Sequence, residues 1–378
     1  MNTYGRKFRV TIFSESHGEA VGAVLDGVPA GLELSEADFE ADIARRRSGA
    51  AGTTPRRESD TPVILSGVWQ GHTTGAPLAI IFRNEDVRSR DYAGFAAMPR
   101  PGHADLVASL KWDDCNDPRG GGHFSGRLTL PVVAAGVVAK KILADATILD
   151  ETPVNDIRAE IIELGGEKIL RSAQDDIDGA QDDTLPCHSE RSEESLQDDT
   201  LPCHSERSEE SSQDDTWQRL VEKAAKEGDS LGAVIECTVP SIDPGYGEPF
   251  WDSVESAISH AVFSIPGVRG IEFGDGFAAA AMKGSEHNDP IGADARPIKN
   301  GAGGINGGLT NGAPILFRVA FKPTSSIAKG QTTFNFETGE MGELKIAGRH
   351  DVCYALRCPV IVEAMTSIAL ADLVLLQR

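Results

Sequence analysis

Residues 119–144, RGGGHFSGRLTLPVVAAGVVAKKILA, join a glycine-rich loop to a long apolar run. Three consecutive glycines at 120–122 allow close approach of the backbone to a ligand, because glycine has no Cβ. Pro131 is typical of a helix start, and the following residues predict an apolar helix from Val132 to about Ala144. A glycine-rich loop before a helix is a natural phosphate site. The loop matches neither the Walker A nor the Rossmann glycine pattern, so nucleotide sites of those types are disfavoured.

Outward from this stretch, the sequence predicts a mixture of strands and helices. Residues 315–321 alternate in a way that fits a strand with one better-buried face. The runs at 61–69 and 76–83 flank a GHTTG turn and predict a hairpin. Strands do not alternate strictly with helices, which favours an α+β fold with antiparallel sheets. Further strands are predicted at 8–14, 231–240 and 268–274, and further helices at 36–46 after Ser35, at 217–226, at 254–262 and after Pro359.

Composition excludes several classes of protein. The 378 residues are 40% hydrophobic, enough for a sizeable core. A formal net charge of −22 argues against a general nucleic-acid binder, because phosphate backbones require a basic surface. No uncharged apolar run approaches the roughly 20 residues that span a bilayer, and the N-terminus lacks the apolar centre of a secretory signal. Six irregularly spaced cysteines indicate no disulfide framework, so we expect a cytoplasmic protein without nucleic-acid or membrane partners.

A repeated acidic segment interrupts the chain. QDDTLPCHSERSEES occurs at 181–195 and again at 197–211, and the segment 172–216 holds 15 acidic and 2 basic residues. It has almost no large apolar side chains with which to offset its ordering entropy, so we expect a disordered insertion within one catalytic domain spanning 1–378. Adjacent Cys–His pairs at 187–188 and 203–204 fit tetrahedral zinc poorly, and no metal site is expected.

Basic and glycine-rich motifs predict an anion site. Arg45, Arg46 and Arg47 end a predicted helix and precede TTPRR at 53–57. The helix dipole accounts for one or two cations at such an end, but not for five arginines within 13 residues. So many like charges repel one another unless an anion lies among them, and arginine suits bidentate contacts with carboxylate or phosphate. These groups together suit a polyanionic substrate and a phosphorylated cofactor.

The ordered motifs resemble those of the chorismate synthase family along nearly the whole chain outside 172–216. The matching stretches are SESHG (14–18), DGVPAG (26–31), RRRSGA (45–50), ILSGVWQGHTTGAPLA (64–79), RSRDY (88–92), RPGHAD (100–105), RGGG (119–122), GDS (228–230), GEPFWD (247–252), AGGINGG (302–308), KPTSSI (322–327) and GRHD (348–351).

The resemblance implies a function and a fold. Members of the family convert 5-enolpyruvylshikimate 3-phosphate to chorismate by an anti-1,4-elimination of phosphate and a proton. The reaction requires reduced FMN although it has no net redox change, because the flavin can lend electron density and recover it. The implied fold is a β-α-β sandwich with helices between antiparallel sheets, and the implied assembly is a homotetramer.

The resemblance also implies site residues. Arg46, Arg127 and Arg349 would line the substrate pocket, with Arg45 and Arg47 close to it. These arginines suit a substrate that carries one phosphate and two carboxylates.

Catalytic roles follow from the same resemblance. His17 and His103 match two catalytic histidines, one expected to protonate or hydrogen-bond the reduced flavin and the other to assist the departing phosphate. Asp351 is expected to act with Ser16 in proton removal. The residues implied to contact FMN are His123, Phe124, Ser125, Gly307, Lys322, Pro323, Thr324, Ser325, Ser326 and Arg349.

The chain departs from the family pattern at some of these positions. The glycine loop continues as HFSGR at 123–127, where RSSAR is commoner, so His123 is expected to take over an anion contact. Gly52 stands where a basic residue often follows the triple arginine, which argues against a direct NADP contact. NADPH is therefore expected only as an indirect reductant of the flavin.

Two other readings stay open from the sequence. One is a flavin- or anion-binding homologue whose catalysis the repeat insertion impairs; retention of His17, His103 and Asp351 favours the enzyme instead. The other treats the insertion as an interaction module.

Overall fold

The computed structural model describes residues 2–56, 58–86, 94–145, 154, 156–168, 206–240, 242–346 and 350–377, with side chains described throughout except at 206–215. The predicted mixture of helices and antiparallel sheets is confirmed, since every strand pair within these residues is antiparallel. Most of the acidic insertion, residues 172–205, lies outside the described residues.

The first sheet is built largely from the N-terminal quarter of the chain. Its strands lie in the order β1-β2-β3-β7-β4. The predicted hairpin is confirmed, because β4 pairs with β7 while the short strands β5 and β6 pair at its tip. The bounds are β1 Thr3–Tyr4, β2 Arg9–Phe13, β3 Ala20–Asp26, β4 Val63–Ser66, β5 Val68–Trp69, β6 His72–Thr73 and β7 Leu78–Arg83.

The second sheet has the order β11-β14-β10-β8-β9. The alternation predicted for 315–321 is confirmed in β14 (Ile315–Phe321), where every second side chain is buried. The other bounds are β8 Arg158–Leu164, β9 Glu167–Lys168, β10 Ala233–Val239 and β11 Val268–Phe273, and two small hairpins are formed by β12 Ile305–Asn306 with β13 Leu309–Thr310 and by β15 Gln331–Asn335 with β16 Glu340–Leu344.

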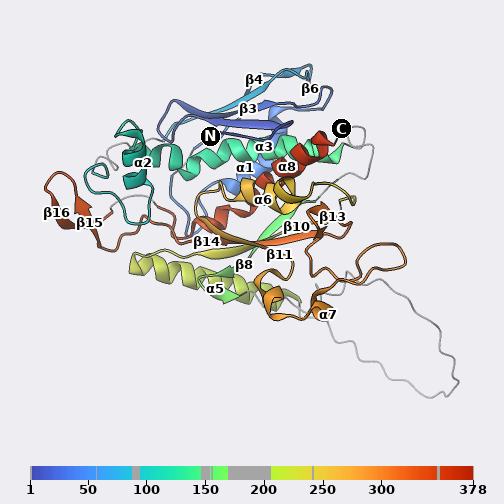
Figure 1. The fold of residues 1–378 in the computed structure, drawn as a ribbon. Helices are drawn as coiled ribbons and strands as arrows, with labels where there is room; N and C mark the ends of the chain where they lie inside the picture. The colour runs from blue at the N-terminus through green and yellow to red at the C-terminus, as the bar shows by residue number, and fades with distance from the viewer. Residues whose placement is uncertain are drawn as a thin grey trace, which may run out of the picture.

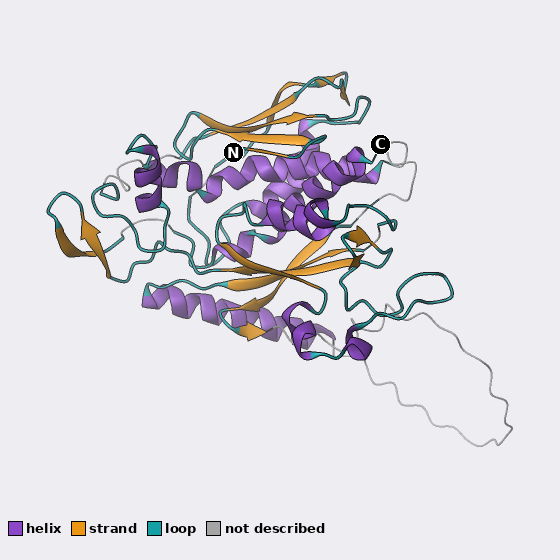
Figure 2. Cartoon of the chain, in the orientation of Figure 1, coloured by secondary structure: helices purple, strands orange, loops and turns teal. Residues whose placement is uncertain are grey.

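Helices α1, α3, α6 and α8 lie in the layer between the two sheets, and α5 covers the outer face of the second sheet (Figures 1 and 2). Helix α2 lies at one end of the molecule, near the β15–β16 hairpin. The central helices are α1 Glu40–Arg46, α3 Thr129–Ala144, α6 Val254–Val262 and α8 Pro359–Leu376, and the others are α2 Asp105–Trp112, α5 Glu206–Glu227 and α7 Gly284–His287.

Several helix boundaries differ from the predictions. Helix α3 begins at Thr129, so Pro131 occupies its first turn, where its missing N–H costs no hydrogen bond. The region predicted as one helix over 36–46 is a 3₁₀ turn, Glu36–Phe39, followed by α1. Helix α5 begins at Glu206, so the expectation of disorder up to 216 is wrong for residues 206–216. Acidic residues there favour the N-terminal end of a helix, which continues into the amphipathic stretch after Trp217.

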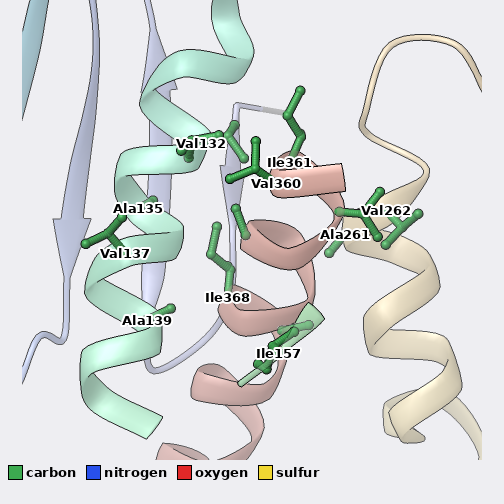
Figure 3. Close-up of a cluster of buried hydrophobic side chains, with 14 of the residues drawn as sticks. Val132, Ala135, Val137, Ala139, Ile157, Ala261, Val262, Val360, Ile361 and Ile368 are labelled. Carbon is green, nitrogen blue, oxygen red and sulfur yellow. The ribbon is translucent and has the colours of Figure 1, made fainter. Parts of the chain in front are cut away.

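The hydrophobic core forms where α3, α8 and α6 meet (Figure 3). Gly136 of α3 permits this contact: a Cβ built there would lie 2.3 Å from the Cβ of Ala364 in α8. Helix α8 is more deeply buried than its predicted apolar face indicates, because most side chains on every side of the helix are buried. This helix is long and apolar enough to cross a membrane by length and composition alone, but 89% of it is buried inside the protein, as in a core helix.

Asp372 is the acidic residue near the end of α8, and its hydrogen bonds explain why it is buried there. Its carboxylate accepts hydrogen bonds from the backbone N–H groups of Arg6, Lys7 and Phe8, at 2.7 to 3.0 Å. The buried acid thereby accepts hydrogen bonds from three consecutive amides at the start of the chain, including the buried amide of Phe8. The C-terminal helix and the N-terminal strands are thus joined beside the core.

Candidate active site

One cavity of about 1170 Å³ collects most of the sequence-predicted site residues. It is larger than the roughly 300–1,000 Å³ of a typical pocket for one small ligand. Its walls are mostly loops and helix ends that lie far apart in the sequence, from the segments 46–60, 100–104, 120–132, 260–269, 322–326 and 350–357. Residues of β1, β2 and α8 complete the lining.

The described lining of this cavity carries a large excess of positive charge. Eight cationic side chains face three carboxylates, so the site suits an anion with several charges. The cations are Arg46, Arg47, Arg56, Arg100, Arg127, Arg269, Lys322 and Arg357, and the carboxylates are Glu58, Asp60 and Asp351.

Arg46 and Arg127 form the buried part of the basic wall. Arg46 ends α1 and donates to the carbonyl oxygen of Gly126 at 2.8 Å, while Arg127 donates from Nε to Asn84 Oδ1 at 2.9 Å. Both guanidinium groups lie against the single carboxylate of Asp60. Burial, followed by the nearby charge of Arg357, lowers the pKa of Arg46. Two buried cations sharing one acid leave positive charge that a substrate anion can neutralise.

Asp351 lies against the segment that follows the triple arginine. Its Oδ1 accepts the backbone N–H of Thr54 at 2.8 Å, and its Oδ2 accepts Arg357 Nη2 at 2.7 Å. Arg357 also lies over the ring of Tyr354, 5.4 Å from its centroid. These contacts fix the direction in which the carboxylate faces the cavity.

His103 follows a left-handed turn at Gly102, whose φ is +70°. Its Nδ1 lies 2.6 Å from Asp105 Oδ1 and 3.1 Å from Arg100 Nη2. The His103 ring lines the cavity, and its side chain is 19% exposed. An imidazole so held can donate or accept a proton at a defined atom.

Ser16 and His17 lie immediately behind the glycine loop. A Cβ built at Gly120, where φ is +62°, would lie 2.0 Å from His17 Nδ1 and 2.7 Å from Ser16 Oγ, so only glycine fits there. Neither residue is among the described lining residues, but Gly120 and Arg56, which contact them, are. Burial, followed by the charges of Arg56 and Arg119, lowers the pKa of His17. The neutral imidazole is therefore favoured near neutral pH.

Eight of the ten residues expected to contact FMN line the cavity, and their part of its wall is called the cofactor end below. Lys322 Nζ donates to the carbonyl of Gly102 at 2.8 Å, and Ser326 Oγ accepts from Arg100 at 3.0 Å. Ser125 starts the short helix Gly126–Leu128 and accepts the N–H of Arg127. The expected flavin contacts that line the cavity are His123, Phe124, Ser125, Lys322, Pro323, Thr324, Ser325 and Ser326.

The local chemistry of this end fits a phosphorylated flavin. It combines an ammonium group, serine and threonine hydroxyls and a glycine turn with the exposed ring of Phe124. Burial, followed by the charge of Arg269, lowers the pKa of Lys322, so an anion here would favour its charged form. His123 is held by Asn2 Oδ1 at 3.0 Å and by the carbonyl of Ser14 at 3.3 Å.

Besides Ser16 and His17, three more expected site residues are not among the described lining residues of this cavity. Arg45 points into a second cavity of about 870 Å³, where it forms a bidentate ion pair with the buried Glu363. Gly307 turns the β12–β13 hairpin and is not among the described lining residues of the first cavity. Arg349 lies outside the residues that the structure describes.

Several lining or supporting residues were given no individual role by the sequence motifs. Arg56 belongs to the basic run after the triple arginine and donates to Ser16 Oγ at 3.4 Å. Arg100 and Asp105 flank His103 in RPGHAD, so their proximity could have suggested a role. Nothing in the local sequence signals Asp60.

Comparison with known proteins gives a consistent result. The family model described as "Chorismate synthase" matches residues 8–375. A curated relative named "Chorismate synthase" from Chitinophaga pinensis is 48% identical over 379 residues, covering 100% of this chain and 98% of the relative. One of the same name from Korarchaeum cryptofilum is 44% identical, covering 98% and 96%. A solved structure titled "Crystal Structure of Chorismate Synthase" matches with a TM-score of 0.68 at 27% identity, covering 99% of this chain and 93% of the other.

Proposed function

The chain belongs to the chorismate synthase family and converts 5-enolpyruvylshikimate 3-phosphate to chorismate, and we propose that it does so in the basic cavity with reduced FMN as cofactor. The observation that carries the proposal is the excess of eight cations over three carboxylates around a space large enough for two ligands. The reaction breaks the C–O bond to phosphate, removes one proton from carbon and leaves a new double bond.

The substrate anions are assigned to the arginine wall. Arg46 and Arg127 are preorganised by their backbone, Asp60 and Asn84 contacts, so they can bind phosphate or carboxylate without rearrangement. Arg47 and Arg56 extend this wall, and Arg349 is assigned to it by its motif. Arg45 is left out because its charge is already paired with Glu363.

The flavin is assigned to the other end, where Ser125 and the Lys322–Ser326 loop would hold it, with His123 and Phe124 beside them. When bound, reduced FMN supplies electron density to the substrate during elimination and recovers it afterwards. The protein's own contribution is to hold the two ligands in contact and exclude water.

Proton handling is assigned to four side chains. His103 lies beside the Lys322–Ser326 loop and would hold a proton on the cofactor side, whereas His17 lies beside Arg56 and would assist the departing phosphate. Asp351 and Ser16 would serve removal of the proton from carbon. Each role requires a general acid or base, a contribution worth roughly 10²- to 10⁴-fold in rate.

We also propose the domain organisation, assembly and cellular location of the enzyme. A single catalytic domain spans the chain with an insertion at 172–216, the layered helices and sheets form a β-α-β sandwich, and four copies assemble into a homotetramer in the cytoplasm. NADPH serves only as an indirect reductant of the flavin. The free thiols of the four described cysteines fit a reducing compartment.

The direct test is an anaerobic assay of the purified protein with substrate and photoreduced FMN. We expect phosphate release and chorismate absorbance in equal amounts, with oxidised FMN inactive and NADPH plus FMN inactive without a separate flavin reductase. His17→Ala should lower kcat by roughly 10²- to 10⁴-fold. Flavin binding without either product would contradict the assignment of catalysis to this cavity.

A further inference from the structure

Asp105 lies between His103 and Arg100 and contacts both side chains. It is the first residue of α2, and both of its oxygens are engaged. Oδ1 lies 2.6 Å from His103 Nδ1 and accepts Arg100 Nη2 at 2.8 Å. Oδ2 accepts Arg100 Nε at 2.7 Å and the Arg100 backbone N–H at 3.0 Å. The carboxylate is not among the described lining residues of the cavity, so it can act on the reaction only through its neighbours.

The distances decide which ring nitrogen of His103 carries the proton. Nδ1 has two neighbours, Asp105 Oδ1 at 2.6 Å and Arg100 Nη2 at 3.1 Å. Without a proton on Nδ1, its lone pair would face the carboxylate at 2.6 Å, which is repulsive. Arg100 Nη2 already has a nearer acceptor in Asp105 Oδ1. A proton on Nδ1 therefore satisfies all three groups, and it leaves Nε2 for the cavity.

Nε2 faces the glycine loop of the cavity. A Cβ built at Gly121 would lie 3.6 Å from Nε2 and 3.7 Å from Cε1, so the ring edge opposite Asp105 meets the loop where the backbone is bare. Gly121 has a φ of +80°, which favours glycine, and its lack of a side chain leaves room beside Nε2.

We propose that Asp105 is a positioning residue for His103: it keeps a proton on Nδ1, so that Nε2 is the atom that exchanges protons in the cavity. This inference rests on the proposed catalytic role of His103. The carboxylate would also stabilise the imidazolium form when Nε2 is protonated, as the aspartate does in serine-protease triads.

Arg100 keeps the carboxylate in place and joins it to the cofactor end. Its guanidinium group lies over the Phe95 ring, 4.4 Å from the centroid, and also donates to Ser326 Oγ. Burial alone would raise the pKa of Asp105, but hydrogen bonds from Arg100 and His103 hold it well below its usual value. Asp105 therefore remains an acceptor at any pH at which the enzyme works.

The test is a double-mutant cycle between Asp105→Asn and His103→Ala, assayed with reduced FMN. In Asp105→Asn the amide can donate to Nδ1 and move the ring proton to Nε2, so we expect kcat to fall by roughly 10²- to 10⁴-fold with KM nearly unchanged. In the His103→Ala background the same substitution should have no further effect, since Asp105 acts through the ring. Asp113→Asn, an exposed aspartate at the other end of α2, is the matched control and should be fully active.

The outcomes separate this inference from the proposed function. Full activity of His103→Ala would overturn the role of His103 itself. If His103→Ala is slow but Asp105→Asn is fully active, only the positioning role of Asp105 is overturned. The same holds if Asp105→Asn lowers kcat equally in the wild-type and His103→Ala backgrounds, or if it changes only KM. Should Asp105→Asn fail to fold, Asp105→Ser keeps a side chain that favours a helix start and gives the same cycle.

Discussion

Asp60 is the carboxylate that two buried guanidinium groups of the cavity share. Arg46 and Arg127 lie on either side of it, and all three side chains are almost fully excluded from solvent. Charges in this position repel one another strongly unless the acid stays in place, because the interior screens poorly. The cavity is thus kept basic enough for an anionic substrate while the apoprotein remains folded.

We therefore expect Asp60→Asn to destabilise the protein by about 3–5 kcal/mol, the cost of leaving buried cations without their acid. Urea unfolding measures this change. The control is Asp26→Asn, which breaks the exposed pair with Arg9 and should cost less than about 1 kcal/mol. Equal losses in the two variants would contradict the shared role of Asp60.

His17 should make stability depend on pH. Its folded pKa is lowered by burial and by Arg56 and Arg119, so the unfolded chain binds a proton first as the pH falls. Titration of His17 does not affect the free energy of unfolding well above the unfolded pKa of about 6.5. Below that pH it lowers the free energy of unfolding, by up to about 1.4 kcal/mol per pH unit.

Unfolding of the wild type and of His17→Asn at pH 7.5 and 5.5 measures this difference. The wild type should lose more stability on acidification than the variant, whatever the variant's stability at pH 7.5. An identical loss in both proteins would show that His17 titrates normally in the fold.

The sequence motifs identified only some of the residues that form the cavity wall. Adjacent residues on a helix point about 100° apart, so the triple arginine cannot send all three side chains to one site. Arg46 turns towards Arg127, whereas Arg45 turns towards Glu363. The motif predicts an anion site, but the direction of each side chain depends on partners such as Asp60 and Glu363, which lie far away in the sequence.

At the scale of elements, the closest packing is between α3 and α8. Gly136 and Ala364 allow the two helices to approach, and the cluster in Figure 3 fills the space on either side. Helix α3 carries Thr129 at its start, where the cavity begins, so its position against α8 also positions the basic wall.

We expect Gly136→Ala to destabilise the protein by about 1–3 kcal/mol, although alanine is the better helix former, because its methyl group overlaps Ala364. Thermal or urea unfolding checks this. Gly284→Ala is the control, since no atom lies within 4 Å of the added Cβ and the helical backbone suits alanine. A Gly136→Ala protein as stable as the control would contradict the proposed closeness of α3 and α8.

Elements with a clear period were predictable from sequence, as β14 and α6 illustrate. The full burial of α8 was not predictable, because an apolar stripe on one face of a helix does not indicate that a second sheet covers its other face. The early start of α5 was also missed, since its first turns are polar and acidic.

At the scale of the whole molecule, the cavity depends on α5 indirectly. Val221 of α5 lies against Gly52, where an added Cβ would come within 2.4 Å of it. The Gly52 carbonyl in turn accepts the N–H of Val352, next to Asp351. The helix thus supports the loop that carries one catalytic candidate, whereas residues 173–205 before it include almost no large apolar side chains that could join the core.

Deletion of residues 173–205, which keeps α5, should therefore leave kcat and KM within about threefold of the full chain, since the cost of a long loop grows only slowly with its length. Deletion of residues 173–227, which removes α5, should abolish activity. A loss of activity or a changed assembly in the shorter deletion would favour the insertion as an interaction module.

The central claim is that one basic cavity holds substrate and flavin together. The most direct measurement is an experimental structure with oxidised FMN and 5-enolpyruvylshikimate 3-phosphate bound. We expect the flavin phosphate beside the Lys322–Ser326 loop and the substrate anions beside Arg46 and Arg127, with His103 Nε2 facing the ligands. Either ligand bound elsewhere, such as in the second cavity beside Arg45, would contradict the account.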